Sequence, residues 1–147
     1  MASEMRVAPD GYGLGKRLHS TPHAEVYEAV RVADGAEVVL KAYLGDRNTD
    51  RRPHAQREFD ALRRIPRPGI PRALDLDRGG EAPVLVLERL PGAALTRALA
   101  DGPLAVDVWL ELAIQLAHIL AHVHDARILH KDLSPNNVLV ESRGERI

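Results

Sequence analysis

The chain has 147 residues, about the size of one domain, and its 45% of hydrophobic and 28% of charged residues allow a buried core with a charged surface. A net charge of -1 gives no electrostatic reason to expect nucleic acid or an anionic membrane as a partner. The sequence has no cysteine, which excludes disulfides, thiolate catalysis and cysteine-based zinc sites.

The N-terminal residues 1–10 are predicted to be a flexible tail, and they contain no apolar run that would make a secretory signal. With cysteine also absent, we expect a cytoplasmic protein. Strands are predicted at 12–18, 25–32 and 37–44. The dipeptide Asp34-Gly35 indicates a tight hairpin between the last two, since glycine accepts the positive φ that such a turn requires.

A helix is predicted next, with an apolar face spaced by three and four residues and with Pro53 in its first turn. Its N-cap candidates are Asn48, Thr49 and Asp50, its apolar face is Ala55, Phe59, Leu62 and Ile65, and the prolines that end it are Pro66, Pro68 and Pro71. Two strands follow near 72–77 and 83–87, and Pro91-Gly92 indicates a linker.

The second half contains a predicted short helix at 95–100 and a long helix at 105–126. Polar residues of the long helix form one stripe, which argues against a membrane span, and its wide apolar face predicts that it is mostly buried. His118 and His122 have metal-ligand spacing, but no third ligand is evident, so we expect solvated histidines. A loop at 130–137, a strand at 138–140 and the start of another strand at 145–147 complete the chain.

The segment HKDLSPNN at 130–137 resembles the catalytic loop of protein kinases, in which H-R-D is followed by an asparagine. The resemblance implies that Asp132 accepts or orients the proton of the substrate hydroxyl and that Asn137 binds Mg²⁺. A carboxylate suits the first task, and an amide oxygen suits a hard cation.

Other segments resemble the same family in the same order. The strand VVLK at 38–41 resembles the V-A-I-K strand, so Lys41 would bind the α- and β-phosphates of ATP and Glu58 on the following helix would pair with it. VLVLERLPG at 84–92 resembles the last strand and hinge of the N-terminal lobe. The remaining implied ATP-binding residues are Val26, Val39, Glu88 and Leu90, the last two through their backbone.

This resemblance implies an α+β, protein kinase-like fold: a five-stranded antiparallel N-lobe with one helix at 11–88, and an incomplete, mainly helical C-lobe at 89–147. It also implies ATP and Mg²⁺ as ligands and a protein as substrate or regulatory partner. The H-K-D loop and the missing glycine-rich loop are similar to the N-terminal kinase-like domain of large bacterial multidomain sensor histidine kinases.

The sequence departs from the family at three places. His19, Thr21 and Ala24 replace the glycines whose N–H groups approach phosphate, and Val39 narrows the adenine slot where the family has alanine. Ser134 replaces a lysine that contacts the γ-phosphate.

The chain also ends before any D-F-G motif. We therefore expect a truncated domain without phosphotransferase activity of its own, whose helix 105–126 exposes apolar surface for self-association or completion by another chain.

Three functions stay open at this point. The first is an ATP-dependent serine/threonine kinase domain, for which Lys41, Glu58, Asp132 and Asn137 argue. The second is a non-catalytic, pseudokinase-like signalling module that binds partners, which the lost glycines and Ser134 favour. The third is a small-molecule phosphotransferase, which also uses an aspartate and a downstream asparagine.

Overall fold

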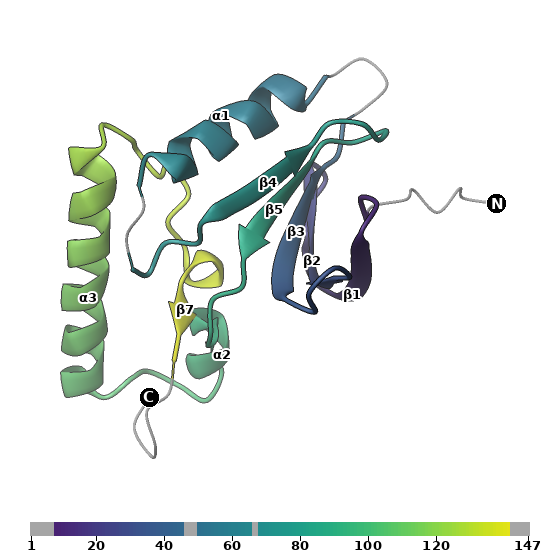
Figure 1. Cartoon of the computed structure of the whole chain (residues 1–147). Helices are drawn as coiled ribbons and strands as arrows, with labels where there is room; N and C mark the ends of the chain where they lie inside the picture. The colour runs from purple at the N-terminus through teal and green to yellow at the C-terminus, as the bar shows by residue number, and fades with distance from the viewer. Residues whose placement is uncertain (1–7, 46–49, 66–67, 142–147) are drawn as a thin grey trace. The chain divides into compact units, whose positions relative to one another are not determined.

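The computed structural model describes residues 8–45, 50–65 and 68–141 (Figure 1). The chain forms two compact units. The first consists of Met1–Pro66 and Pro71–Arg89, and the second of Arg67–Ile70 and Leu90–Ile147. Several predicted features lie outside the described residues: the cap candidates Asn48 and Thr49, the helix-ending Pro66, and the strand at 145–147.

The first unit is built on a five-stranded antiparallel sheet in the order β1-β2-β3-β5-β4. Its strands are β1 (Tyr12–Ser20), β2 (Ala24–Arg31), β3 (Glu37–Tyr43), β4 (Ala73–Asp77) and β5 (Val84–Glu88). The turn between β2 and β3 is the predicted one, with Gly35 at a φ of 71°. The α+β fold with a five-stranded antiparallel sheet is thus confirmed.

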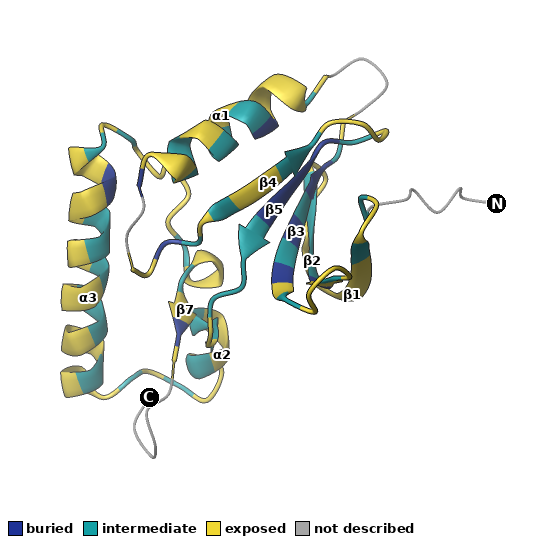
Figure 2. Ribbon diagram, viewed as in Figure 1, coloured by how far each residue is buried: buried dark blue, intermediate teal, exposed yellow. Residues whose placement is uncertain are grey.

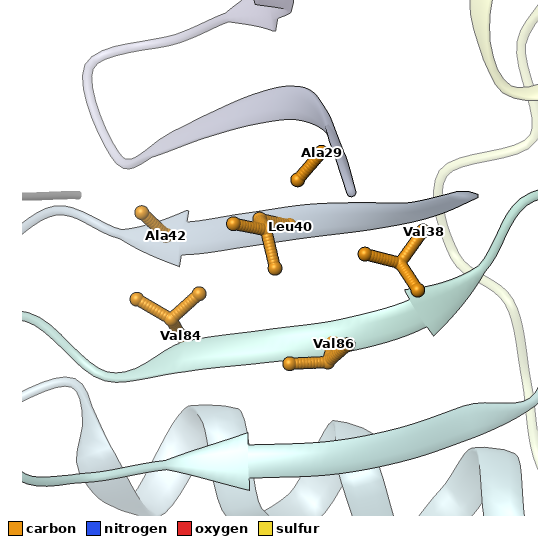
Figure 3. Packing of buried hydrophobic residues seen from close by; sticks show 6 residues of the cluster. All are labelled: Ala29, Val38, Leu40, Ala42, Val84 and Val86. Atoms are coloured by element: carbon orange, nitrogen blue, oxygen red, sulfur yellow. The ribbon is translucent and has the colours of Figure 1, made fainter. Parts of the chain in front are cut away.

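The two faces of this sheet bury different residues, because side chains alternate along each strand. One face carries the aliphatic cluster drawn in Figure 3: Ala29, Val38, Leu40, Ala42, Val84 and Val86. The opposite face carries Tyr43 and Leu85, which pack with Ala55 of the helix α1 (Arg52–Arg63). This second face also carries Lys41, two residues before Tyr43 on β3.

The prediction that Asn48, Thr49 or Asp50 caps α1 is wrong where it can be examined, because the N-cap is Arg51 and makes no side-chain cap bond. Asp50 still helps to start the helix, since its carboxylate accepts a hydrogen bond from the N–H of Arg52 at 2.9 Å. Pro53 lies in the first turn, as predicted.

The second unit contains the helices α2 (Leu95–Ala98) and α3 (Val106–Asp125), the short 3-10 helix η1 (Pro135–Asn137) and a two-stranded ladder. The ladder pairs β6 (Ala93–Ala94), which the sequence did not predict, with β7 (Leu139–Val140). The N–H of Leu95 extends this pairing by donating to the carbonyl of Val138 at 2.8 Å.

The short segment at 68–70 clusters with this second unit. Gly69 lies so close to α3 that a Cβ there would be 2.7 Å from Cδ1 of Ile119. Its φ of +83° is one that side-chain-bearing residues rarely adopt, so the backbone favours glycine at this position.

The helix α3 is exposed over most of its surface, which Figure 2 shows, and only Val123 of its residues is buried. The prediction that it is mostly buried is therefore wrong for the described chain, and the expected exposed apolar surface is present. Its large exposed side chains are Val106, Trp109, Leu110 and Ile114, spaced along one face. By length and composition alone, α3 passes as a membrane-span candidate, the single one among the described helices.

Candidate functional site

An ion pair joins the central strand of the first unit to its helix. Lys41 Nζ on β3 donates hydrogen bonds to both carboxylate oxygens of Glu58 on α1, each at 2.8 Å. Both side chains are about three-quarters removed from solvent. A pair in this partly shielded position is less screened than a surface pair, so it fixes the lysine more firmly.

A tyrosine completes this group. The hydroxyl of Tyr43 donates to Oε2 of Glu58 at 2.6 Å, and Lys41 Nζ lies 5.0 Å from the centroid of the Tyr43 ring. Burial, and then the neighbouring Glu58 carboxylate, raise the pKa of Tyr43 far above its usual range. The hydroxyl therefore stays protonated and remains a hydrogen-bond donor at physiological pH.

The predicted adenine-lining valines lie on the same face of the sheet as Lys41. Val26 on β2 is directly opposite Lys41 in the β2–β3 pairing, and Val39 precedes Lys41 by two residues. Both valines are half-buried. The structure thus brings together Val26, Val39, Lys41 and Glu58 within the first unit.

The two predicted hinge residues fall in different units. Glu88 ends β5, and its N–H donates to the carbonyl of Arg72 at 2.9 Å, while its carboxylate accepts from the Arg72 N–H at 3.2 Å and from Nε at 3.3 Å. The Glu88 N–H is thus engaged within the sheet. Leu90 begins the longer segment of the second unit.

The turn between β1 and β2, where kinases have glycines, is held by a side chain. Oγ1 of Thr21 accepts hydrogen bonds from the N–H groups of His23 at 3.2 Å and Ala24 at 3.0 Å. The N–H of Thr21 donates to the carbonyl of Ala24 at 2.8 Å. Three backbone donors of this turn are therefore satisfied internally.

The predicted catalytic loop lies in the second unit, and the structure brings its two key residues together. Nδ2 of Asn137 donates to the main-chain carbonyl of Asp132 at 2.8 Å and to its Oδ2 at 3.1 Å. The N–H of Asp132 donates to Nδ1 of His130 at 3.3 Å. The hydrogen bonds from Asn137 connect the end of the loop to Asp132 near its start. Both Asp132 and Asn137 are exposed.

The backbone of this loop is strained beside Asp132. Lys131 has a φ of 63°, a left-handed conformation that costs a lysine about 1–2 kcal/mol. Such strain persists where surrounding bonds over-determine the conformation, and it is concentrated at functional sites. Here those bonds come from His130 and Asn137 on either side.

The hydrogen bonds that Tyr43 and Thr21 make were not predicted from the sequence. Tyr43 lies two positions after Lys41, so the alternation of a strand could have placed both on one face of β3. Thr21 was recognised only as a lost glycine, although threonine in a turn is a known partner for N–H groups two and three residues on. Both roles therefore had a signal in the sequence: strand alternation for Tyr43 and the position in a turn for Thr21.

Comparison with known proteins identifies the family. The protein kinase domain matches residues 14–147. The serine/threonine-protein kinase pkn2 of Myxococcus xanthus is 33% identical over 95% of this chain and 18% of its own length. The DNA damage-responsive serine/threonine-protein kinase RqkA of Deinococcus radiodurans is 35% identical over 90% of this chain and 20% of its own length. CBL-interacting protein kinase 19 of Oryza sativa is 32% identical over 91% of this chain and 27% of its own length.

The chain thus spans less than a third of the length of each of these three relatives. All three are named as protein kinases, so the likeness to the kinase-like domain of sensor histidine kinases stays a prediction. The family match covers β2 to β7, which includes the strand of Lys41, the helix of Glu58 and the loop from His130 to Asn137. This chain belongs to the protein kinase domain family.

Proposed function

We propose that this chain contributes to a serine/threonine kinase, which transfers the γ-phosphoryl group of ATP to a protein hydroxyl with Mg²⁺, and that the 147 residues alone do not catalyse this transfer. The observation that carries this proposal is the Lys41–Glu58 pair, with both carboxylate oxygens at 2.8 Å from Nζ. Such a pair directs the lysine to the α- and β-phosphates in kinases. The serine/threonine kinases among the relatives support the substrate class.

The second unit supplies residues suited to the remaining tasks. Asp132 presents a carboxylate that would orient the substrate hydroxyl and accept its proton. The amide nitrogen of Asn137 is occupied by Asp132, so its amide oxygen is the atom available to a cation, and Mg²⁺ prefers oxygen ligands. Mg²⁺ would neutralise charge that develops on the phosphates.

Val26 and Val39 would offer apolar contacts to the adenine ring, and Glu88 and Leu90 would offer backbone groups. Because the Glu88 N–H already bonds Arg72, its adenine contact would come from its carbonyl. We also propose a cytoplasmic location, and a protein partner or a second copy on the exposed apolar face of α3.

The nucleotide part of this proposal is tested by titrating Mg-ATP into the 147-residue chain in a calorimeter. We expect saturable binding that Lys41→Met weakens by about a hundredfold, since a charge-assisted contact to phosphate is lost. Lys16→Met is the matched control, because Lys16 on β1 makes no contact with Glu58, and it should bind as the unaltered chain does. Equal binding by the Lys41→Met variant would contradict the proposal.

The pseudokinase alternative also has a specific observation in its favour. Thr21 occupies the N–H groups of His23 and Ala24, and such N–H groups are what a glycine-rich loop offers to phosphate. On this reading the protein recognises partners and binds nucleotide weakly or not at all.

Releasing these donors tests how far the turn limits nucleotide binding. We expect Thr21→Gly to tighten Mg-ATP binding about threefold to tenfold, because two N–H groups become available and the backbone can approach more closely. Thr21→Ser is the control, since it keeps the accepting hydroxyl and should leave the affinity unchanged. If Thr21→Gly changes nothing in a chain that binds Mg-ATP, the turn does not limit binding.

A further inference from the structure

The carboxylate of Glu58 has two partners, and they differ in how firmly they are held. Lys41 approaches both oxygens at 2.8 Å, and the Tyr43 hydroxyl approaches Oε2 at 2.6 Å. The side chains of Lys41 and Glu58 are 26% and 30% exposed, whereas Tyr43 is 3% exposed. Of the three groups, Tyr43 is therefore the fixed one.

Tyr43 is fixed by packing on every side that the described contacts reveal. It belongs to the cluster that Ala55 and Leu85 form between α1 and the sheet, and its ring meets that of His54 edge-on at 5.7 Å. Its N–H donates to the carbonyl of Pro83 at 3.0 Å. A ring packed in this way has little conformational freedom, so its hydroxyl stays in one position, where it can bind the Glu58 carboxylate.

The same side chain also contacts the lysine. Nζ of Lys41 lies 5.0 Å from the ring centroid, within the range of a cation–π attraction. Ala55 and Glu58 are three residues apart on α1 and share one helix face, so the helix that packs on the ring is the helix that delivers Glu58. Tyr43 thus contacts both members of the ion pair: its hydroxyl donates to Glu58, and its ring lies near Lys41 Nζ.

We propose that Tyr43 is a positioning residue that holds Glu58, and through it Lys41, in the arrangement that receives the phosphates of ATP. The expected effect on nucleotide affinity rests on the proposed nucleotide-binding function. The hold of Tyr43 on the ion pair does not depend on that function. Without the hydroxyl, Glu58 loses its buried anchor and populates solvent-directed conformations. Nucleotide affinity then falls in proportion to the fraction of molecules with the pair formed.

The variant Tyr43→Phe tests this, because it keeps the ring, its packing and its contact with Lys41 and removes only the hydroxyl. Tyr27→Phe is the matched control, since Tyr27 donates a hydrogen bond of 2.8 Å to Glu25 in the same sheet and has no contact with the ion pair. Both variants are made in the full 147-residue chain.

The first measurement is the rate of reductive methylation at Lys41, followed by mass spectrometry with Lys16 as internal reference. We expect Tyr43→Phe to raise the rate at Lys41 about threefold to tenfold, because losing a hydrogen bond to a charged group frees the nitrogen that Glu58 covers. The rate at Lys16 and both rates in Tyr27→Phe should not change. An unchanged rate at Lys41 in Tyr43→Phe overturns the proposal.

The second measurement compares the dissociation constants of Mg-ATP and adenosine. Tyr43→Phe should weaken Mg-ATP about threefold to tenfold and leave adenosine unchanged, since adenosine has no phosphate for Lys41 to bind. Equal weakening of both ligands would show a packing role and overturn the positioning role. If the unaltered chain binds no Mg-ATP while methylation at Lys41 rises as expected, the proposed function fails and the hold of Tyr43 on the pair stands.

Discussion

Gly92→Ala is expected to destabilise the second unit by about 3 kcal/mol or more, because an alanine there is both strained and obstructed. Gly92 has a φ of +102°, and a Cβ on it would lie 2.6 Å from the carbonyl oxygen of Val140. That oxygen is main-chain and belongs to the β6–β7 ladder, so it cannot turn aside as a side chain would.

The loss should reach the catalytic loop, because β7 begins two residues after Asn137, the last residue of η1. Shifting Val140 away from Gly92 would strain the pairing of Ala93 with Val140 and the bond from Leu95 N–H to Val138. We therefore expect weaker protection from hydrogen exchange at Asn137 as well as lower stability.

Urea unfolding of the full chain measures this effect with probes that separate the units. Trp109, the single tryptophan of the sequence, lies in the second unit, whereas all three tyrosines, Tyr12, Tyr27 and Tyr43, lie in the first. Tryptophan fluorescence should therefore show an earlier transition in Gly92→Ala.

The matched control is Gly102→Ala. Gly102 has a φ of +123° but nothing within 4 Å of an added Cβ, so this variant carries strain without obstruction and should lose only about 1–2 kcal/mol. Equal losses in the two variants would show that contact with Val140 contributes nothing.

The sequence predicted the sheet of the first unit well, because each strand has a clear local signal. A nearly continuous apolar run marks β3, and the glycine at 35 meets the positive φ of the hairpin turn. The Lys41–Glu58 pair and the bond between Asp132 and Asn137 join residues that the family resemblance had already grouped. Their roles in binding and catalysis stay predictions until the ligand is tested.

The features that the sequence did not predict depend on contacts distant along the chain. The burial of α3 was inferred from its composition, but burial depends on which surfaces meet it, and among the described residues few do. The strand β6 has only two residues, too few for a periodic pattern, and it exists because β7 pairs with it. The hydrogen bond of Tyr43 likewise depends on α1, which brings Glu58 to the Tyr43 hydroxyl.

The N-cap of α1 was missed for a related reason. Asp50 has the side chain that N-caps prefer, but the helix begins one residue later than that preference implies, at Arg52 after Arg51. Packing of Ala55 and Phe59 against the sheet sets the start of the helix, and the carboxylate of Asp50 adapts by bonding the N–H of Arg52. Tertiary contacts here outweigh a local preference of about 1 kcal/mol.

Leu40→Ala should have the largest effect on the first unit, a loss of about 3–4 kcal/mol. Leu40 is 0% exposed on the central strand β3, and Figure 3 shows it between Ala29 of β2 and Val86 of β5. The strands on either side are fixed by their ladders, so they cannot close the cavity that the lost methyl groups leave. With a slope of about 2 kcal/mol per molar urea, the midpoint followed by tyrosine absorbance should fall by about 1.5–2 M.

Leu14→Ala is the control, because it deletes the same atoms from a residue of β1 that is 46% exposed, and it should cost under about 1 kcal/mol. A similar loss in both variants would contradict the assignment of the core. Leu40 also points to the sheet face opposite Lys41, since the two are adjacent on β3. In the absence of urea, Leu40→Ala should therefore bind Mg-ATP with unchanged affinity per folded molecule. Stability and nucleotide binding are then separable on a single strand, with alternate residues serving the core and the ion pair.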